Sequence, residues 1–274
     1  MMEVCEMKAI ARWVRSQVLE MIVSAGKGHI GGSFSCTDIL IALYHGGVLR
    51  FDAKSPQWSG RDRFIFSKGH SAEALYAVLA NLGFFPASEL CTYGQGGSML
   101  SGHADNKIPG IEISTGSLGH GLGIAAGLAL AAKLDKKDYL AVALLGDGEC
   151  YEGSVWEAAM FAAHHRLENL VAIVDRNGQI TLDYTEECNR FEPFDEKWRA
   201  FGWDVRVVDG HSFEALLDAF MDVRERNSRR PLMIIAKTVK GKGVSFMEGD
   251  LYWHHNVPKG EKLDTAKREL ALNG

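Results

Sequence analysis

The sequence has few cysteines, and none of them lie in a pattern typical of a metal or disulfide site. The five cysteines are odd in number, widely scattered, and include no CxxC pair. Such cysteines are unsuited to holding a metal or cycling a disulfide, and they are typical of a protein of the reducing cytoplasm. We therefore expect a cytoplasmic location.

Long apolar runs and blocks of like charge are also missing. Charged residues such as Glu3, Lys8 and Arg12 interrupt the apolar core that an N-terminal signal peptide would need. The longest uncharged and mostly apolar run, 121–132, is shorter than the roughly 20 residues that span a bilayer. The net charge is −5, with 30 Lys and Arg against 35 Asp and Glu in mixed order. Neither a membrane nor a nucleic acid is an expected partner.

What the chain does have is an alternation of strand and helix patterns. Hydrophobic residues make up 46% of its 274 residues, enough for a substantial core. Apolar steps of three and four residues predict a helix over 6–25, which the glycine-rich stretch 26–32 ends. Strands are expected at 63–67, 139–145, 170–175, 203–208 and 231–237, and helices at 72–82, from near 118, and at 154–165 and 213–224. Continuous apolar strands between helices favour one α/β domain over 1–274, with a parallel sheet covered on both faces.

Two segments stand out from this alternation. The stretch 93–119 is long, irregular and rich in Gly, Ser and Pro, and such stretches in compact domains are more often functional than idle. The helix that follows is apolar almost all round (GLGIAAGLALAA), so we expect protein to cover both of its faces. A subunit interface is one way to cover it.

Polar residues follow two of the predicted strands at the edge where parallel sheets bind ligands. Gly146, Asp147 and Gly148 come after YLAVALL, and Asn177 and Gly178 come after LVAIVDR. Carboxylate and amide oxygens suit Mg²⁺ or Ca²⁺, and the glycines let a diphosphate approach the backbone. A GDG triplet alone is more often a simple turn, but the Asp and Asn here are one strand–helix–strand crossover apart.

This paired motif resembles the thiamine-diphosphate signature, and five segments in register resemble the N-terminal part of transketolases. They are 24–40, 62–77, 101–127, 146–158 and 237–255, which include SAGKGHIGGS, DRFIFSKGH, STGSLGHG, GDGECYEG and KTVKGKG. Together they cover nearly the whole chain. The resemblance implies the diphosphate-binding fold of thiamine enzymes, with thiamine diphosphate and Mg²⁺ or Ca²⁺ as cofactors.

The resemblance also implies site residues. The metal would be held by Asp147, Asn177 and the Gln179 carbonyl. Contacts to thiamine diphosphate would come from His70, Gly116, Ser117, Leu118, Gly148, Asn177, Lys240 and His254. His29, His103 and His254 would face the sugar hydroxyls, and Glu152 would link paired active sites across a dimer. His45, His164, His165 and His211 are expected to be ordinary core or surface residues.

Some of these assignments have rivals. Lys240 could equally be a solvated lysine, and Glu152 an ordinary residue at a helix start. His254 and His255 compete for one role, and the spacing from Lys240 favours His254. The chain departs from the family pattern at His120, where Gln is usual. The loop after Asn177 also differs from some family members, which leaves Gln179 the least certain ligand.

By resemblance, the activity is reversible transfer of a two-carbon ketol unit from a ketose to an aldose. His29 and His254 would move the proton of the C3 hydroxyl, while His103 would hold the donor near its C1 hydroxyl. Transketolases supply a further glutamate from a pyrimidine-binding domain that this chain lacks. We therefore expect a second subunit that carries this domain, in an α2β2 heterotetramer acting on a sugar phosphate or sulfonate.

Three alternatives remain open at this point. The α subunit of a 2-oxo-acid dehydrogenase shares the fold and metal site but lacks this histidine set. A deoxyxylulose-phosphate synthase shares more of the chain but is normally one polypeptide. A non-catalytic subunit that keeps the fold only to bind a partner is disfavoured by the intact Asp147, Asn177 and histidines.

Overall fold

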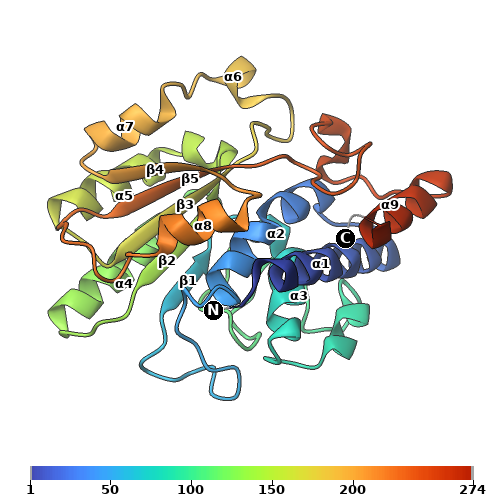
Figure 1. Cartoon of the computed structure of the whole chain (residues 1–274), viewed down its shortest axis with the longest axis horizontal. Coiled ribbons are helices and arrows are strands. Elements are labelled where there is room, and N and C mark those ends of the chain that lie inside the picture. Colours follow the sequence, from blue (N-terminus) through green and yellow to red (C-terminus); the bar gives the residue numbers. More distant parts are fainter. Residues whose placement is uncertain (1, 273–274) are drawn as a thin grey trace.

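Five parallel strands form the centre of the structure, a computed structural model that describes residues 2–272 (Figure 1). In spatial order they are β1 (Arg63–Phe66), β2 (Ala141–Gly146), β3 (Leu170–Arg176), β5 (Leu232–Lys237) and β4 (Asp204–Asp209). Gly146 of β2 is in register with Asp175 of β3, which is in register with Ala236 of β5. The predicted parallel sheet is confirmed, and these three strands end at one edge. The range 1–274 expected for the domain includes Met1, Asn273 and Gly274, which lie outside the described residues.

Helices cover both faces of the sheet. One face carries α4 (Gly121–Leu134) and α5 (Gly153–His164), with α7 (Phe194–Ala200) beyond them. The other carries α2 (Ile30–Tyr44), α3 (Ala72–Asn81) and α8 (Phe213–Phe220), and α1 (Val4–Ala25) packs outside α2 and α3. In Figure 1, α9 (Glu261–Leu272) lies beside α1. The short helices are η1 (Gly69–Ser71), η2 (Ala87–Thr92), η3 (Gly148–Tyr151), α6 (Thr185–Cys188) and η4 (Leu251–His254).

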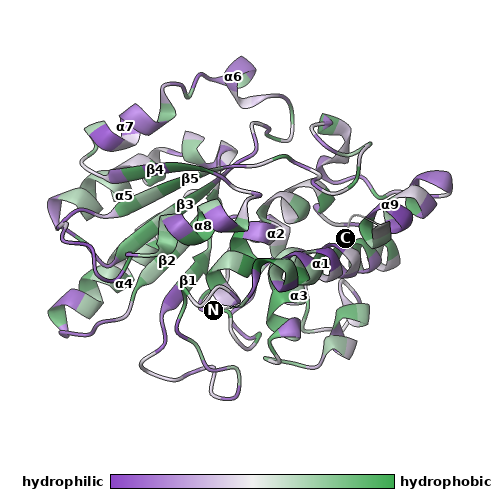
Figure 2. Cartoon of the chain, viewed as in Figure 1, coloured by the Kyte–Doolittle hydropathy of each residue, from purple (hydrophilic) through white to green (hydrophobic). Residues whose placement is uncertain are grey.

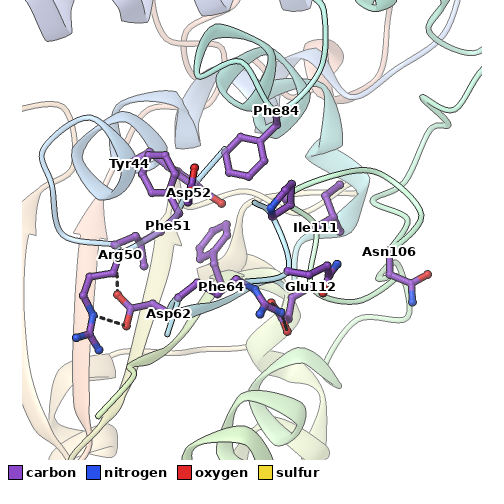
Figure 3. Close-up of a pocket in the computed structure, with 15 residues that line it drawn as sticks. Tyr44, Arg50, Phe51, Asp52, Asp62, Phe64, Phe84, Asn106, Ile111 and Glu112 are labelled. Carbon is purple, nitrogen blue, oxygen red and sulfur yellow. Dashed lines mark hydrogen bonds and ion pairs between the residues drawn. The ribbon is translucent and has the colours of Figure 1, made fainter. Parts of the chain in front are cut away.

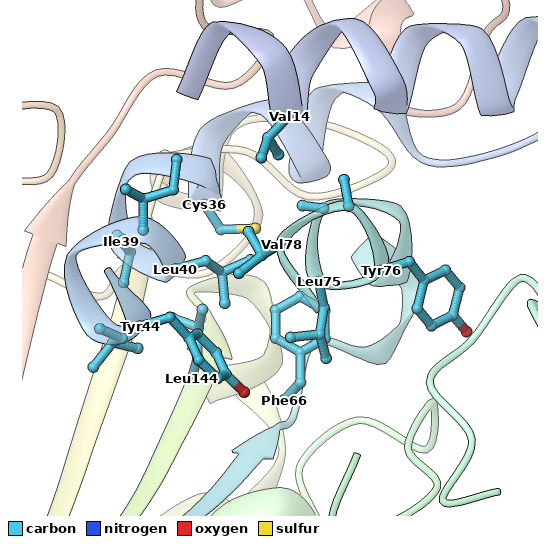
Figure 4. Close-up of a cluster of buried hydrophobic side chains, with 14 of the residues drawn as sticks. Val14, Cys36, Ile39, Leu40, Tyr44, Phe66, Leu75, Tyr76, Val78 and Leu144 are labelled. Atoms are coloured by element: carbon cyan, nitrogen blue, oxygen red, sulfur yellow. The ribbon is translucent and has the colours of Figure 1, made fainter. Parts of the chain in front are cut away.

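Two hydrophobic cores result from the alternation of side chains along the strands. In β2, Ala143 and Leu145 join the core under α4 and α5, whereas Val142 and Leu144 join the core under α2 and α3. The strands are accordingly hydrophobic along most of their length (Figure 2). Figure 4 shows the core under α2 and α3, where Leu40 of α2 and Leu144 of β2 are buried together with side chains of α3. The continuous apolar runs that predicted strands therefore serve two cores at once.

Helix α2 was not predicted, and the interpretation of 26–32 as only the end of α1 was wrong. Gly26, with φ 68°, does end α1, but α2 begins at Ile30 and every one of its residues is buried. Burial on all sides removes the polar face that marks a helix in sequence. Two glycines in its first turn are required by packing, since a Cβ on Gly31 would lie 2.7 Å from the Trp253 carbonyl oxygen, and one on Gly32 2.6 Å from Ser71 Oγ.

Helix α4 differs from its prediction in a second way. It begins at Gly121, and only one of its faces is covered: Leu122, Ala125 and Ala129 are buried, whereas Gly123 and Gly127 are exposed. The expected cover of the other face is not provided by residues 2–272, so a subunit interface there stays a prediction. Helix α8 likewise ends at Phe220, short of the predicted 213–224. Across residues 2–272, no helix has the length and apolar character needed to cross a membrane.

Candidate active site

A cleft of about 450 Å³ lies beyond the carboxyl ends of β1, β2, β3 and β5. Residues far apart in the sequence, from His29 to His254, line it together. The predicted site residues among its lining are His29, His70, His103, Gly116, Leu118, Asp147, Gly148, Glu152, Asn177, Gln179, Lys240 and His254. Ser117 is exposed and does not line the cleft, and neither does His255.

Four histidine rings converge at this cleft from four different segments. The ring centroid of His29 lies 5.2 Å from that of His70, 5.7 Å from His254 and 6.2 Å from His103. The rings of His70 and His254 are stacked at 6.2 Å. His255 is exposed, and its ring centroid lies 5.7 Å from that of His254. The structure therefore brings together all four histidines that the sequence singled out.

Burial keeps the imidazoles of His29, His70 and His254 neutral. It lowers the pKa of His29 to about 4 and that of His254 to about 3, and it holds the pKa of His70 well below its usual value. The Nδ1 atoms of His29 and His254 are buried and have no hydrogen-bond partner in the part of the chain that the structure describes. The Nε2 atom of His254 lies 3.2 Å from Thr181 Oγ1. A neutral imidazole with a free nitrogen can take a proton from a hydroxyl or return one.

Oxygen atoms gather on another part of the cleft wall. The buried Asp147 carboxylate accepts hydrogen bonds from the backbone N–H groups of Gly148 (2.8 Å) and Gly178 (2.6 Å), which holds it beside the loop after β3. Burial and the neighbouring Asp175 raise its pKa, while Arg176, 3.2 Å away, opposes this. Asn177 Oδ1 accepts a hydrogen bond from the backbone N–H of Gln179 at 3.2 Å.

These oxygens fit a hard cation better than a transition metal. A carboxylate, an amide oxygen and the Gln179 carbonyl are the donors that Mg²⁺ and Ca²⁺ prefer. No three His, Cys, Asp or Glu side chains within residues 2–272 converge in a way that could hold a metal. A cation here would depend on the amide and carbonyl oxygens, as predicted for Asn177 and Gln179.

Lys240 stands at the same wall. It is buried, and its ammonium group donates to the Gln179 carbonyl at 3.2 Å. Burial lowers its pKa to about 8. The alternative of a solvated lysine is therefore wrong, and the side chain places a positive charge close to Asp147.

Glycines leave room for a ligand to reach the backbone. Gly116 has φ 143°, and a Cβ there would lie 2.8 Å from the His103 ring. A Cβ on Gly148 would lie 2.5 Å from Ile180. Both positions are closed to larger residues, and the missing side chains leave the backbone there within reach of a diphosphate. The residues present thus fit thiamine diphosphate with its cation.

Glu152 lies at the edge of the cleft as the N-cap of α5, where its side chain is exposed and makes no capping hydrogen bond. A Cβ on Gly119 would meet it at 2.5 Å, so it packs against the start of the α4 segment. This is the ordinary position of an acidic residue at a helix start.

Buried charges in and beside the cleft wall were missed by the sequence analysis. Lys68 donates to the Gly32 carbonyl at 2.9 Å and forms an ion pair with Asp175, which also accepts from Ser35 Oγ at 2.6 Å. Both members of the pair are buried. Burial alone would lower the pKa of Lys68, but Asp175 raises it above its usual value. The signal was present, since Lys68 lies within the SKGH motif and Asp175 ends an apolar strand.

Glu149 was also missed. It follows the GDG turn, is buried, and accepts from the N–H groups of Gly119 (2.9 Å) and Gly146 (3.1 Å) and from the Ser67 hydroxyl. Burial raises its pKa. The carboxyl group ties the loop before α4 to the end of β2, and so shapes the floor of the cleft.

A second cavity of about 210 Å³ lies away from these residues (Figure 3). Aromatic rings of Tyr44, Phe51, Phe64 and Phe84 line it, and none of the predicted site residues does. At its edge, the buried Asp62 accepts from backbone N–H groups of neighbouring loops. Predicted metal ligands and clustered histidines occur together only in the first cleft, among the cavities of residues 2–272.

Comparisons with known proteins point the same way. Residues 6–274 match the family described as transketolase, thiamine diphosphate binding domain. The chain is 45% identical over 257 residues to one of the subunits of an apulose-4-phosphate transketolase from Phocaeicola vulgatus, covering 94% of this chain and 91% of that one. It is 43% identical over 265 residues to a 6-deoxy-6-sulfo-D-fructose transketolase subunit of a Clostridium species, covering 96% of each. The solved transketolase of Campylobacter jejuni superposes with a TM-score of 0.91 at 30% identity, and the match covers 98% of this chain but 43% of that one.

Proposed function

The chain belongs to the transketolase family and is a thiamine-diphosphate-dependent transketolase subunit, and we propose that it is the half that holds the diphosphate and the metal. The observation that carries this proposal is the meeting, in one cleft, of neutral buried imidazoles with the oxygens around Asp147. The cofactor supplies, when bound, the nucleophilic carbon that no protein side chain offers.

Asp147, Asn177 and the Gln179 carbonyl hold the metal in this proposal, with Mg²⁺ or Ca²⁺ as the ion. Their support is the hard-oxygen character of the three groups and the hydrogen bond that ties Asp147 to the loop of Asn177. The cation would offset the charge that a diphosphate brings to a buried carboxylate.

The diphosphate would be held by glycine backbone on one side and by Lys240 and His70 on the other. Gly116 and Leu118 line the cleft on one side and Gly148 on another, while the ammonium of Lys240 and the ring of His70 face the same space. Ser117 would contact the cofactor only through its backbone, since its side chain is exposed. These groups bind and orient the cofactor.

His29 and His254 exchange the proton of the donor's C3 hydroxyl. Each ring carries a buried Nδ1 without a partner among residues 2–272, and each is neutral at pH 7 because burial disfavours its charged form. His103, which is more exposed at the mouth of the cleft, holds the donor near its C1 hydroxyl. His255 does not line the cleft, which favours His254 for the shared role.

A partner subunit completes the site. This chain matches 43% of a solved transketolase chain, and two of its relatives are named as subunits. We infer that a second polypeptide with the pyrimidine-binding domain supplies the missing glutamate, in an α2β2 heterotetramer of the cytoplasm. The exposed face of α4 and the carboxylate of Glu152 would meet partner chains there.

The donor is a ketose with an anionic group at its far end. One relative is named for a 4-phosphate sugar and the other for a 6-sulfo sugar, and identity to this chain is almost the same for both. We therefore propose a phosphorylated or sulfonated ketose as donor and an aldose as acceptor.

The test is an assay of ketol transfer with the purified chain, with and without a candidate pyrimidine-domain subunit. We expect transfer only from the mixture, together with a rise in melting temperature, because a partner that binds the folded chain stabilises it. Phosphorylated and sulfonated ketoses are compared in parallel, and an Asp147→Ala mixture is the inactive control. Transfer by the single chain at the rate of the mixture would show that no partner is needed.

A further inference from the structure

Glu73, in the first turn of α3, is a buried carboxyl group that the proposed chemistry does not use. Its side chain is 0% exposed. Oε1 accepts from the backbone N–H of His29 at 3.1 Å and from the Tyr93 hydroxyl at 2.7 Å. Oε2 accepts from Ser33 Oγ at 2.8 Å. Three donors from two segments, the start of α2 and the end of η2, therefore converge on one carboxylate.

This carboxylate has no counter-charge. No Lys or Arg side chain forms an ion pair with it in residues 2–272. It instead lies at the N-terminus of α2, where His29 is the N-cap and Ser33 is in the first turn, so the positive end of a 15-residue helix faces it. The Glu73 carboxylate is stabilised by these hydrogen bonds and by the dipole of α2, so its position depends on both.

The hydrogen bond from the His29 N–H to Glu73 fixes the backbone from which the His29 imidazole projects. His29 has φ −114° and ψ 70°, outside the helical region, and its side chain does not cap the helix. Gly28 before it has φ 153°, and a Cβ there would lie 2.6 Å from Glu73 Oε1. The backbone thus closes tightly over the carboxylate, and the direction of the His29 ring follows from this contact.

We propose that Glu73 is a positioning residue for His29, which it holds by the backbone so that the ring meets His70, His103 and His254 in the cleft. The inference rests on the proposed function of His29. Glu73 does not reach the cleft itself and does not line it. The Tyr93 and Ser33 hydroxyls donate to the Glu73 carboxylate, so protein groups rather than water satisfy its oxygens.

Three variants separate the geometry of this group from its charge. Glu73→Gln keeps an oxygen at full reach but removes the charge, and its amide can donate to Ser33. Glu73→Asp keeps the charge but withdraws the oxygen by one methylene. Glu73→Met fills the space and offers no acceptor.

In the enzyme assembled with its partner subunit, the expected order of kcat/KM is Gln above Asp and Asp at or above Met. The Gln variant should stay within about threefold of the wild type, because a neutral hydrogen bond replaces a charged one. The Met variant should lose about 10- to 100-fold, the size expected for a displaced catalytic group. Affinity for thiamine diphosphate should change by less than about twofold, since the proposed diphosphate ligands are untouched.

A double-mutant cycle with His29→Ala identifies the route of the effect. If Glu73 acts through His29, Glu73→Met should cost almost nothing once His29 is alanine. Asp62→Asn is the matched control, because Asp62 is also buried and also holds backbone N–H groups, those of Arg50 and Leu140, beside the other cavity. Its effect on kcat/KM should be small and unchanged by His29→Ala.

Several results would overturn the inference. They are a Met variant as active as the wild type, a loss that persists in full in the His29→Ala background, or an Asp variant more active than the Gln variant. If the Met variant does not assemble, the order of Gln and Asp still decides.

The imidazole NMR signals of His29 give a readout that needs no activity. They should shift in Glu73→Asp and not in Asp62→Asn. Absence of ketol transfer by the wild-type assembly would therefore count against the proposed function alone. His29 signals that do not shift in Glu73→Asp would count against the positioning role of Glu73.

Discussion

Replacement of Asp38 by Asn tests the buried network behind α2. Arg15 donates to Asp38 through two nitrogens, at 3.1 and 2.6 Å, and also to the Phe34 carbonyl at 3.0 Å. The N–H of Val239 donates to His211 Nε2 at 2.8 Å, so His211 Nδ1 carries the proton that it donates to Asp38 at 2.6 Å. One carboxylate thus joins α1, α2 and the loop that leads to Lys240.

The size of the loss follows from the burial of the pair. The side chains of Arg15 and Asp38 are 8% and 6% exposed. Removal of one partner from a buried ion pair costs about 3–5 kcal/mol. We expect about 3 kcal/mol, the low end of that range, because Arg15 keeps the Phe34 carbonyl and borders a cavity of about 450 Å³. Replacing both partners, with Arg15→Met, should recover about 1–2 kcal/mol of it.

The effect should also depend on pH. Burial alone would raise the pKa of Asp38, but Arg15 and then His211 lower it below 3.8. A carboxyl group with a lowered folded-state pKa stabilises the protein fully above its unfolded pKa and loses this effect as the pH falls through the folded value. The difference between wild type and Asp38→Asn should therefore be constant from pH 7 to 5 and shrink below about pH 4.

Urea denaturation of the purified chain, followed by circular dichroism, measures this difference. Asp52→Asn is the control, because Asp52 is exposed, and it should change the free energy of unfolding by less than about 0.5 kcal/mol. A loss below about 1 kcal/mol in the free energy of unfolding for Asp38→Asn at pH 7 would refute the reasoning. So would a double variant whose loss equals the sum of the losses from Asp38→Asn and Arg15→Met.

Three further predictions concern the cleft. Asp147→Ala or Asn177→Ala should abolish metal-dependent binding of thiamine diphosphate, because the diphosphate then meets uncompensated charge; undiminished affinity in calorimetry would remove the metal assignment. His103→Ala should slow turnover and leave cofactor affinity nearly intact, as steady-state kinetics beside a cofactor titration would show; a large loss of cofactor binding would contradict its placement at the sugar. Since the pKa values of His29 and His254 are lowered to about 4 and about 3, both rings stay neutral and kcat/KM should not fall between pH 8 and 6 through their protonation. An acid limb near pH 6.5 that His29→Gln removes would count against this.

The strands and their ends could be predicted because their signal is local. Continuous apolar runs bounded by Asp147 and Asn177 mark two buried parallel strands, and parallel register places both ends at one edge. The histidines were singled out by resemblance, and only the fold shows that the rings of His70, His103 and His254 lie within about 6 Å of the His29 ring.

Buried charges could not be predicted in the same way. Sequence patterns treat Lys, Glu and Asp as surface residues, and Lys68 finds its partner Asp175 more than 100 positions away in the chain. Glu73 similarly depends on donors that only the packing of three segments brings together. Helix α2 was missed for the related reason that a helix buried on every side has no polar face to reveal it.

The insertion of β5 between β3 and β4 has a consequence for how the protein is made. The ribosome releases β3 and β4 first, yet both strands pair only with β5 on their facing edges. Until residues 232–237 emerge, the nascent chain presents two open strand edges of the kind that recruit other chains. Lys240 and His254 follow later still, so the cleft can close only near the end of translation. Between the emergence of β3 and that of β5, the nascent chain therefore exposes strand edges of the kind that chaperones shield.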